Sequence, residues 1–125
     1  MNKLLQKSQE EANKDDFSEE SVIHQFFGIE PQRKIPATID LRLADNTFRA
    51  VPYSYIMDIE FDPVVGIDIF TSTKYIKITG RNLRLLYDYL AQFRVRYIQA
   101  NIGADLAEND EPFVATIAVG NLADL

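Results

Sequence analysis

The densest run of chemically active side chains is the segment DIEFDPVVGID. Asp58, Glu60 and Asp62 follow one another two residues apart, and Asp68 ends the run. Such carboxylates could open a calcium-binding loop or serve as a pair in hydrolysis. A calcium loop needs a glycine where this chain has Pro63. A spacing of two is also the period of a strand with one solvent-exposed face, and the sequence favours that interpretation.

Other catalytic signatures are scarce. His24 is the single histidine, and the absence of cysteine excludes disulfides, thiolate metal sites and a cysteine nucleophile. The five glycines are scattered and form no phosphate-binding loop. We therefore expect no metal, no cofactor and no catalytic set. A small metal-dependent hydrolase using Asp58, Glu60 and Asp68 is only a third hypothesis.

A basic stretch interleaved with tyrosines is a second candidate site. Basic side chains can hold phosphates, while tyrosine rings stack on nucleobases. Our alternative hypothesis is therefore RNA or single-stranded nucleic-acid binding. The same cations could equally form the solvated face of a helix and a strand, paired with local acids. The residues of this candidate surface are Lys77, Arg81, Arg84, Arg94 and Arg96.

Length and charge set further limits. The 125 residues suit one domain, and the net charge of −6 is concentrated near the two ends. We expect residues 1–16 to be a polar mobile arm or frayed helix, and residues 17–125 to form a single α+β domain. The sequence contains neither a signal-like apolar run nor a membrane-length one, so we expect a cytoplasmic protein that does not bind a membrane.

The apolar pattern predicts a helix followed by five strands. The segment DFSEESVIHQFFGIEP has helical spacing and a closing Gly28, so we expect a short N-terminal helix. IDLRL alternates like a half-buried strand, and Asp45 and Asn46 suit a tight turn before TFRAV. Tyr53 begins a third strand whose odd-numbered residues are predicted to share an apolar face. GIDIFTS and KYIKIT are the fourth and fifth strands.

The rest of the chain predicts one long helix and a final strand. Leu83, Leu86, Tyr87 and Leu90 lie on one helical face, so we expect an amphipathic helix from Arg81 to about residue 93 that covers the sheet. Residues 94–98 fit either the last helical turn or another strand. The uncharged segment of residues 112–122 should be buried as a strand, on its own sheet or on that of a partner.

Two segments resemble a known family. LRLADNTFRAV, followed later by YIKITGRNL, is similar to the two halves of the Sm-like RNA-binding barrel. The resemblance implies a curved five-stranded barrel and points to Asp45, Asn46, Gly80 and Arg81 as positions to test. Asn46 replaces the turn glycine of that family, and Thr79 stands where the family has arginine. A pleckstrin-like half-barrel with a C-terminal helix fits the same order of elements.

The sequence therefore predicts an α+β fold: a short N-terminal helix, a curved antiparallel five-stranded sheet or small partial barrel, one covering helix and a C-terminal strand. The function it favours is a non-catalytic interaction module that self-associates or binds a protein partner, with a homodimer as the simplest case. Apolar surface without charge is typical of stable interfaces. The predicted interface residues are Leu85, Tyr89, Phe113, Val114 and Ile117.

Overall fold

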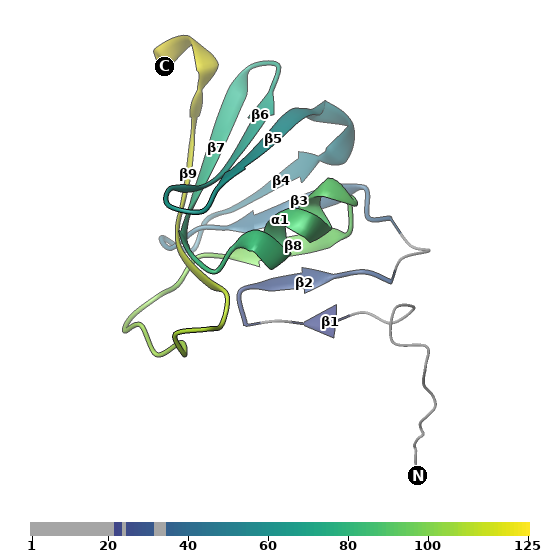
Figure 1. The fold of residues 1–125 in the computed structure, drawn as a ribbon. Helices are drawn as coiled ribbons and strands as arrows, with labels where there is room; N and C mark the ends of the chain where they lie inside the picture. The colour runs from purple at the N-terminus through teal and green to yellow at the C-terminus, as the bar shows by residue number, and fades with distance from the viewer. Residues whose placement is uncertain (1–21, 24, 32–34) are drawn as a thin grey trace.

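The computed structural model describes residues 22–23, 25–31 and 35–125. The predicted arm of residues 1–16 and His24 lie outside the described residues. Within them the chain forms a mainly-β α+β fold with two sheets and one short α-helix (Figure 1).

The first sheet is mixed. Its order is β1-β2-β8-β3-β4, and the parallel pair is β3 with β8. The two-residue β1 only extends the edge of a sheet of four longer strands. The strands are β1 (Val22–Ile23), β2 (Phe27–Ile29), β3 (Thr38–Arg42), β4 (Phe48–Pro52) and β8 (Val95–Gln99).

The second sheet is antiparallel throughout, with the order β5-β6-β7-β9. Its inward side chains are apolar, with Ile67, Ile69, Ile76 and Ile78 almost fully buried. The strands are β5 (Ile56–Asp62), β6 (Gly66–Thr71), β7 (Lys74–Arg81) and β9 (Phe113–Asn121).

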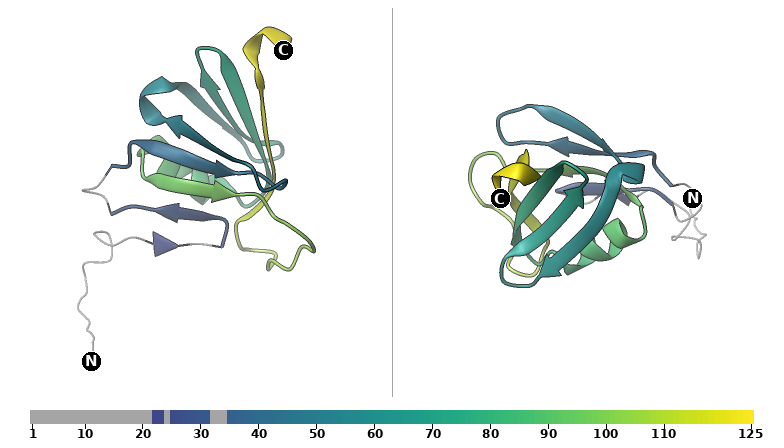
Figure 2. Two further views of the ribbon diagram at one scale, coloured as in Figure 1. Left: turned by 180° about the vertical axis from the view of Figure 1, so that it is seen from behind. Right: turned by 90° about the horizontal axis from the view of Figure 1, so that it is seen from above.

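The core lies between the two sheets. They come together along one side and diverge on the other, where the helix α1 (Arg84–Ala91) lies between β5 and β8 (Figures 1 and 2). Leu86 and Leu90 point from α1 into the core and are fully buried. The Phe61 and Tyr87 rings stack with centroids 5.5 Å apart and join β5 to the helix. The helix therefore closes one open side of the core. The apolar face of each sheet is covered mainly by the other sheet.

The prediction of a short N-terminal helix is wrong over its described part. Residues 22–23 and 27–29 form β1 and β2, which pair with each other, and β2 continues onto β8. The apolar residues Phe26, Phe27 and Ile29 are still buried, although the segment is not helical. Pairing with β8 satisfies the backbone of this segment, and this tertiary contact overrides a weak local helical preference.

The five predicted strands exist as β3 to β7, but they do not form one sheet or a barrel. Asp45 and Asn46 do form the predicted turn: Asn46 has φ 70°, and the Asp45 carboxylate accepts hydrogen bonds from Thr47. Pro52 and a 3₁₀ turn (Tyr53–Tyr55) then lead the chain from the first sheet to the second. The described strands close no barrel, so the fold implied by the Sm-like resemblance is wrong.

The odd-numbered residues from Tyr53 to Phe61 do not share the one apolar face that the sequence predicted. The 3₁₀ turn and a β-bulge between Ile56 and Asp58 interrupt the period of two. Tyr55 and Met57 are consequently exposed, while Ile59 is half-buried.

The long helix is shorter than predicted, because β7 continues through Arg81 and the helix stops at Ala91. Phe93 takes the left-handed conformation, with φ 59°. The Phe93 and Arg94 amides donate to the carbonyls of Leu90 and Tyr89, which is the Schellman pattern with phenylalanine where glycine is usual. The chain then enters β8, so most of the undecided segment 94–98 is strand. The segment 112–122 mostly forms β9, which pairs with β7 of its own chain.

Candidate functional site

The acidic run lies on the outer face of the second sheet. Glu60 of β5 is opposite Asp68 of β6, which is opposite Lys77 of β7. The Lys77 ammonium contacts the Asp68 carboxylate at 3.0 Å. Asp58 and Glu60 are exposed, as expected for the solvent-exposed face of a strand. No group of three or more potential metal ligands occurs among the described residues.

The neighbouring acids affect the ionisation of Glu60. The pKa of Glu60 is raised by a hydrogen bond with the Asp58 carboxyl group, then by slight desolvation and by the negative charges of Asp58 and Asp68. Asp62 has a structural role, since its carboxylate accepts hydrogen bonds from the amides of Val64 and Val65 in the following turn. The acids therefore provide no enclosed site in which a substrate could be held away from water.

The predicted basic surface is distributed over β7, α1 and β8. Four of its five cations contact a carboxylate, which lowers their availability for phosphate, and three of these four lie on β7 and α1. The paired atoms are Lys77 Nζ with Asp68 Oδ1 at 3.0 Å, Arg81 Nη1 with Asp105 Oδ2 at 2.6 Å, and Arg84 Nε with Asp88 Oδ1 at 3.1 Å.

The remaining two cations are held on β8 and beside it. Arg94 is only 8% exposed, donates from Nε to the Glu30 carbonyl at 3.0 Å and lies over the Tyr89 ring. Arg96 Nε contacts the Glu30 carboxylate at 2.9 Å. The Tyr97 ring lies against Arg96, at 5.8 Å from its guanidinium carbon. The structure thus brings these cations into contact with the protein's own acids and rings, and does not gather all five at one open surface.

The predicted interface residues fall in two places. Phe113, Val114 and Ile117 lie on β9 and are buried within their own chain. Leu85 is 39% exposed on α1, and Tyr89 is half-buried beside Phe27, with ring centroids 6.4 Å apart. The side chains of β9 therefore offer little to a partner, whereas the backbone of that strand offers more.

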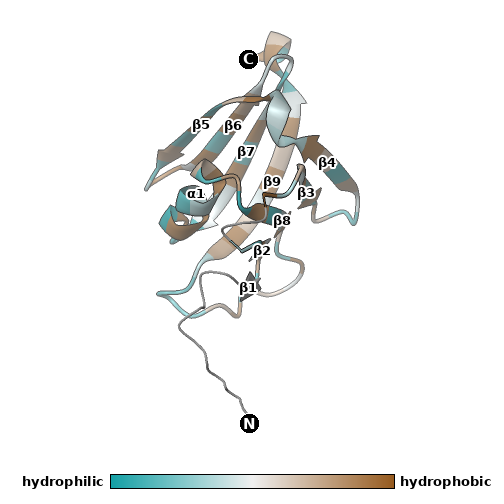
Figure 3. Ribbon diagram, turned by 90° about the vertical axis from the view of Figure 1, so that its right-hand side faces the viewer, coloured by the Kyte–Doolittle hydropathy of each residue, from teal (hydrophilic) through white to brown (hydrophobic). Residues whose placement is uncertain are grey.

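β9 is an edge strand. Among the described residues it pairs only with β7, and its backbone contact outside this ladder is the bond from Asn101 N to Val114 O, 2.9 Å long. The strand has nine residues, FVATIAVGN, and carries no charge. Figure 3 shows β9 mostly in brown and white, whereas teal bands cross β5, β6 and β7.

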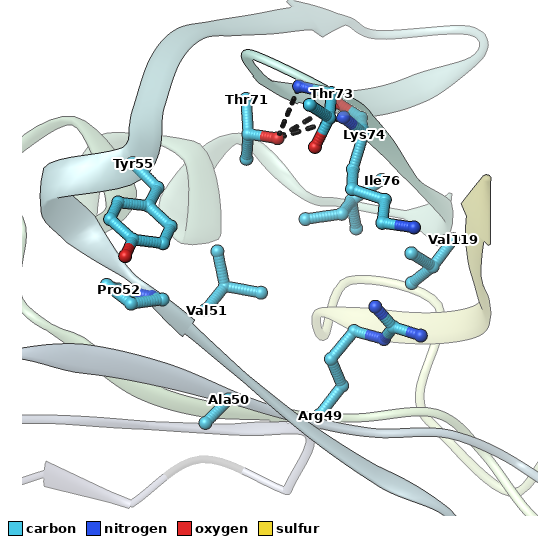
Figure 4. Close-up of a pocket in the computed structure, with 10 residues that line it drawn as sticks. All are labelled: Arg49, Ala50, Val51, Pro52, Tyr55, Thr71, Thr73, Lys74, Ile76 and Val119. Atoms are coloured by element: carbon cyan, nitrogen blue, oxygen red, sulfur yellow. Dashed lines mark hydrogen bonds between the residues drawn. The ribbon is translucent and has the colours of Figure 1, made fainter. Parts of the chain in front are cut away.

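The structure also contains a cavity that sequence reasoning missed. It has a volume of about 260 Å³ and lies between β4 and the inner face of the second sheet (Figure 4). Two cations and several hydroxyl groups line it together with apolar side chains, and none of the described lining residues is acidic. The lining residues are Arg49, Ala50, Val51, Pro52, Tyr55, Thr71, Thr73, Lys74, Ile76 and Val119.

Comparison with known proteins adds no family to this description: no family model, no curated protein and no solved structure matches the chain. In the described part of the chain, every helix is too short or too polar to cross a lipid bilayer.

Proposed function

We propose that the protein is a non-catalytic interaction module that forms a homodimer by antiparallel pairing of β9 with β9 of a second copy. The single observation that supports this most strongly is the open, uncharged edge of β9. Unpaired amides and carbonyls along such an edge form a ready template for another strand.

The other long sheet edges carry features that discourage strand addition. β5 has a bulge and three acids, Asp58, Glu60 and Asp62. β4 has Arg49 and ends at Pro52, which cannot donate a backbone hydrogen bond. The register shift opposite Thr79 and Gly80 affects only the start of β9. From Thr116 to Asn121 the strand has no bulge, no charged residue and no proline. Among the described strands, β9 is therefore the one edge suited to pairing, and a two-fold axis would satisfy both copies equally.

Nearby apolar side chains can enlarge the contact. The loop between β8 and β9 exposes Ile102 and Leu106, at 59% and 84%. A stable interface buries more than about 1,000 Å² in total, which strand pairing by six or so residues does not reach alone. We therefore expect this loop to pack on the second copy beside the paired strands.

The test is a lysine placed on the edge. Ala118 is exposed near the middle of β9, so Ala118→Lys should preserve the fold while bringing two positive charges close together across the two-fold axis. Size-exclusion chromatography with light scattering should give twice the chain mass of 14.3 kDa for the unaltered protein and 14.3 kDa for the variant.

The control is Ala91→Lys, which adds the same charge at an exposed position at the end of α1, outside both β9 and the loop before it. It should remain dimeric. The proposal fails if the unaltered chain is monomeric, or if both lysine variants behave alike.

A further inference from the structure

We propose that the cavity between β4 and the second sheet binds a small amphipathic carboxylate, with the anionic group at Arg49 and Lys74 and the apolar part against Val51, Ile76 and Val119. This inference goes beyond self-association and does not depend on it.

The strand period explains why the cavity is apolar inside and basic at its rim. Ile76 of β7 is opposite Val119 of β9, and Lys74 is opposite Asn121, so all four face the same side of the sheet. Ile76 is buried, whereas Lys74 at the strand end is half-exposed. The inner face of β7 is therefore apolar at Ile76 and cationic at its first residue, Lys74.

β4 contributes the opposite wall by the same rule. Arg49 and Val51 share one face of the strand, and they pair with Leu41 and Ile39, both of which are buried. Arg49 is exposed, but it lies on the same face of β4 as the buried Val51. In Figure 4 its guanidinium reaches from β4 towards Lys74 and Val119, with Tyr55 on the far side of the cavity.

Neither cation has a carboxylate partner among the described residues. The Arg49 side chain makes no hydrogen bond or ion pair with the described residues, and Lys74 Nζ donates to the neutral Asn121 Oδ1 at 2.7 Å. Of the six other described cations, Arg94 is buried and donates to the Glu30 carbonyl, and five contact a carboxylate: Arg42, Lys77, Arg81, Arg84 and Arg96. In a protein of net charge −6, two cations without acids at one cavity indicate a site for an external anion.

The turn between β6 and β7 fixes Lys74. The Thr71 hydroxyl accepts hydrogen bonds from the amides of Thr73 and Lys74, at 3.3 and 3.0 Å. Thr71 is buried, so the position of the Lys74 backbone is set before any ligand arrives. The planar guanidinium of Arg49 can bind both oxygens of a carboxylate, and Lys74 has two ammonium protons left after its bond to Asn121.

The volume of about 260 Å³ limits the ligand to a small molecule. It is slightly below the usual range for drug-sized ligands, which begins at about 300 Å³. A medium-chain or aromatic monocarboxylate combines one anionic group with an apolar body of suitable size.

Three probes distinguish the parts of this proposal in an NMR titration of the ¹⁵N-labelled full chain. Octanoate has both the charge and the apolar chain, 1-octanol has the chain alone, and inorganic phosphate has only charge. Octanoate should shift the amide signals of Thr73, Lys74 and Val119, and should bind at least about tenfold more tightly than either of the others. Equal binding of octanoate and octanol, or of octanoate and phosphate, would overturn the proposal, as would no binding of octanoate.

Variants locate the anionic group. Arg49→Gln and Lys74→Gln should each weaken octanoate binding about tenfold or more and leave octanol binding unchanged. The matched control is Arg84→Gln, which removes an exposed cation from α1 and should leave octanoate binding unchanged. If Arg49 only protects the edge of β4, the Arg49→Gln variant will bind octanoate as the unaltered chain does, and this outcome contradicts the assignment.

Discussion

At the residue scale, the Tyr53 side chain links the turn between the two sheets to the start of β8. Tyr53 is 8% exposed and begins the turn between the sheets. Its hydroxyl donates to the Val95 carbonyl at 2.8 Å and accepts from the Val95 amide at 3.0 Å. Burial raises its pKa, so the hydroxyl remains protonated and keeps its donor. A single side chain thus satisfies both backbone groups at the start of β8.

Removing that hydroxyl should be costly. Tyr53→Phe leaves the buried Val95 amide and carbonyl without this partner, so we expect the free energy of unfolding to fall by about 1–3 kcal/mol. Urea denaturation followed by circular dichroism measures this difference. The control is Tyr55→Phe, since Tyr55 is 64% exposed and makes no hydrogen bond within the described residues. Equal stability of the two variants would show that the Tyr53 bonds contribute nothing.

At the scale of elements, the sequence predicted the strands β3 to β7 well but missed β1 and β2, and it predicted the pairing of strands poorly. The alternating patterns from Ile39 to Thr79 correspond to β3 to β7, because a half-buried strand must alternate. The division into two sheets depends on the turn after Pro52 and on β8 joining β3, a contact between segments more than fifty residues apart. No local pattern encodes such pairing. The end of α1 at Ala91 was predicted about two residues too late, because the residue in the left-handed position, Phe93, is not glycine.

The cavity and the edge of β9 were missed for the same reason. Arg49 and Lys74 are twenty-five residues apart, and only the facing of two sheets makes them neighbours. The apolar character of the β9 segment was visible in the sequence, but its place at an edge was not. The acids of β5 were interpreted correctly as an exposed strand face, since their spacing alone contained that information.

The pairing of β7 with β9 requires glycine at one position. A Cβ atom on Gly80 would overlap the carbonyl oxygen of Phe113 on the neighbouring strand. Gly80→Ala should therefore lower the free energy of unfolding by about 1–3 kcal/mol, because the backbone of β9 would have to move.

Gly120→Ala is the matched comparison, measured by the same urea denaturation. A Cβ atom there meets only the ring of Tyr75, a side chain that can rotate away. We expect a smaller loss for Gly120→Ala than for Gly80→Ala. The reverse order would mean that the contact between β7 and β9 is looser than the structure indicates.

At the scale of the whole molecule, the described residues form two sheets and a closing helix, and the edge strand β9 carries no charge. The net charge of −6 makes copies repel one another at long range, but at physiological ionic strength this repulsion is screened beyond about 8 Å. The proposed association would then come from short-range pairing at β9 and from the exposed loop before it. The proposed ligand site is a different feature from the proposed interface, since it is the cavity lined by Arg49 and Lys74.

The most direct test of the central claim is the distance between the two copies of β9. The chain has no cysteine, so Ala118→Cys gives one labelling site for a nitroxide. Adjacent strands lie about 4.8 Å apart, and two labels on paired β9 strands should be within about 20 Å, close enough to broaden the electron paramagnetic resonance spectrum. We predict this broadening for fully labelled protein and its loss on dilution with unlabelled chains. A spectrum without dipolar broadening at a concentration where light scattering shows a dimer would contradict pairing through β9, and a monomer in both measurements would contradict self-association itself.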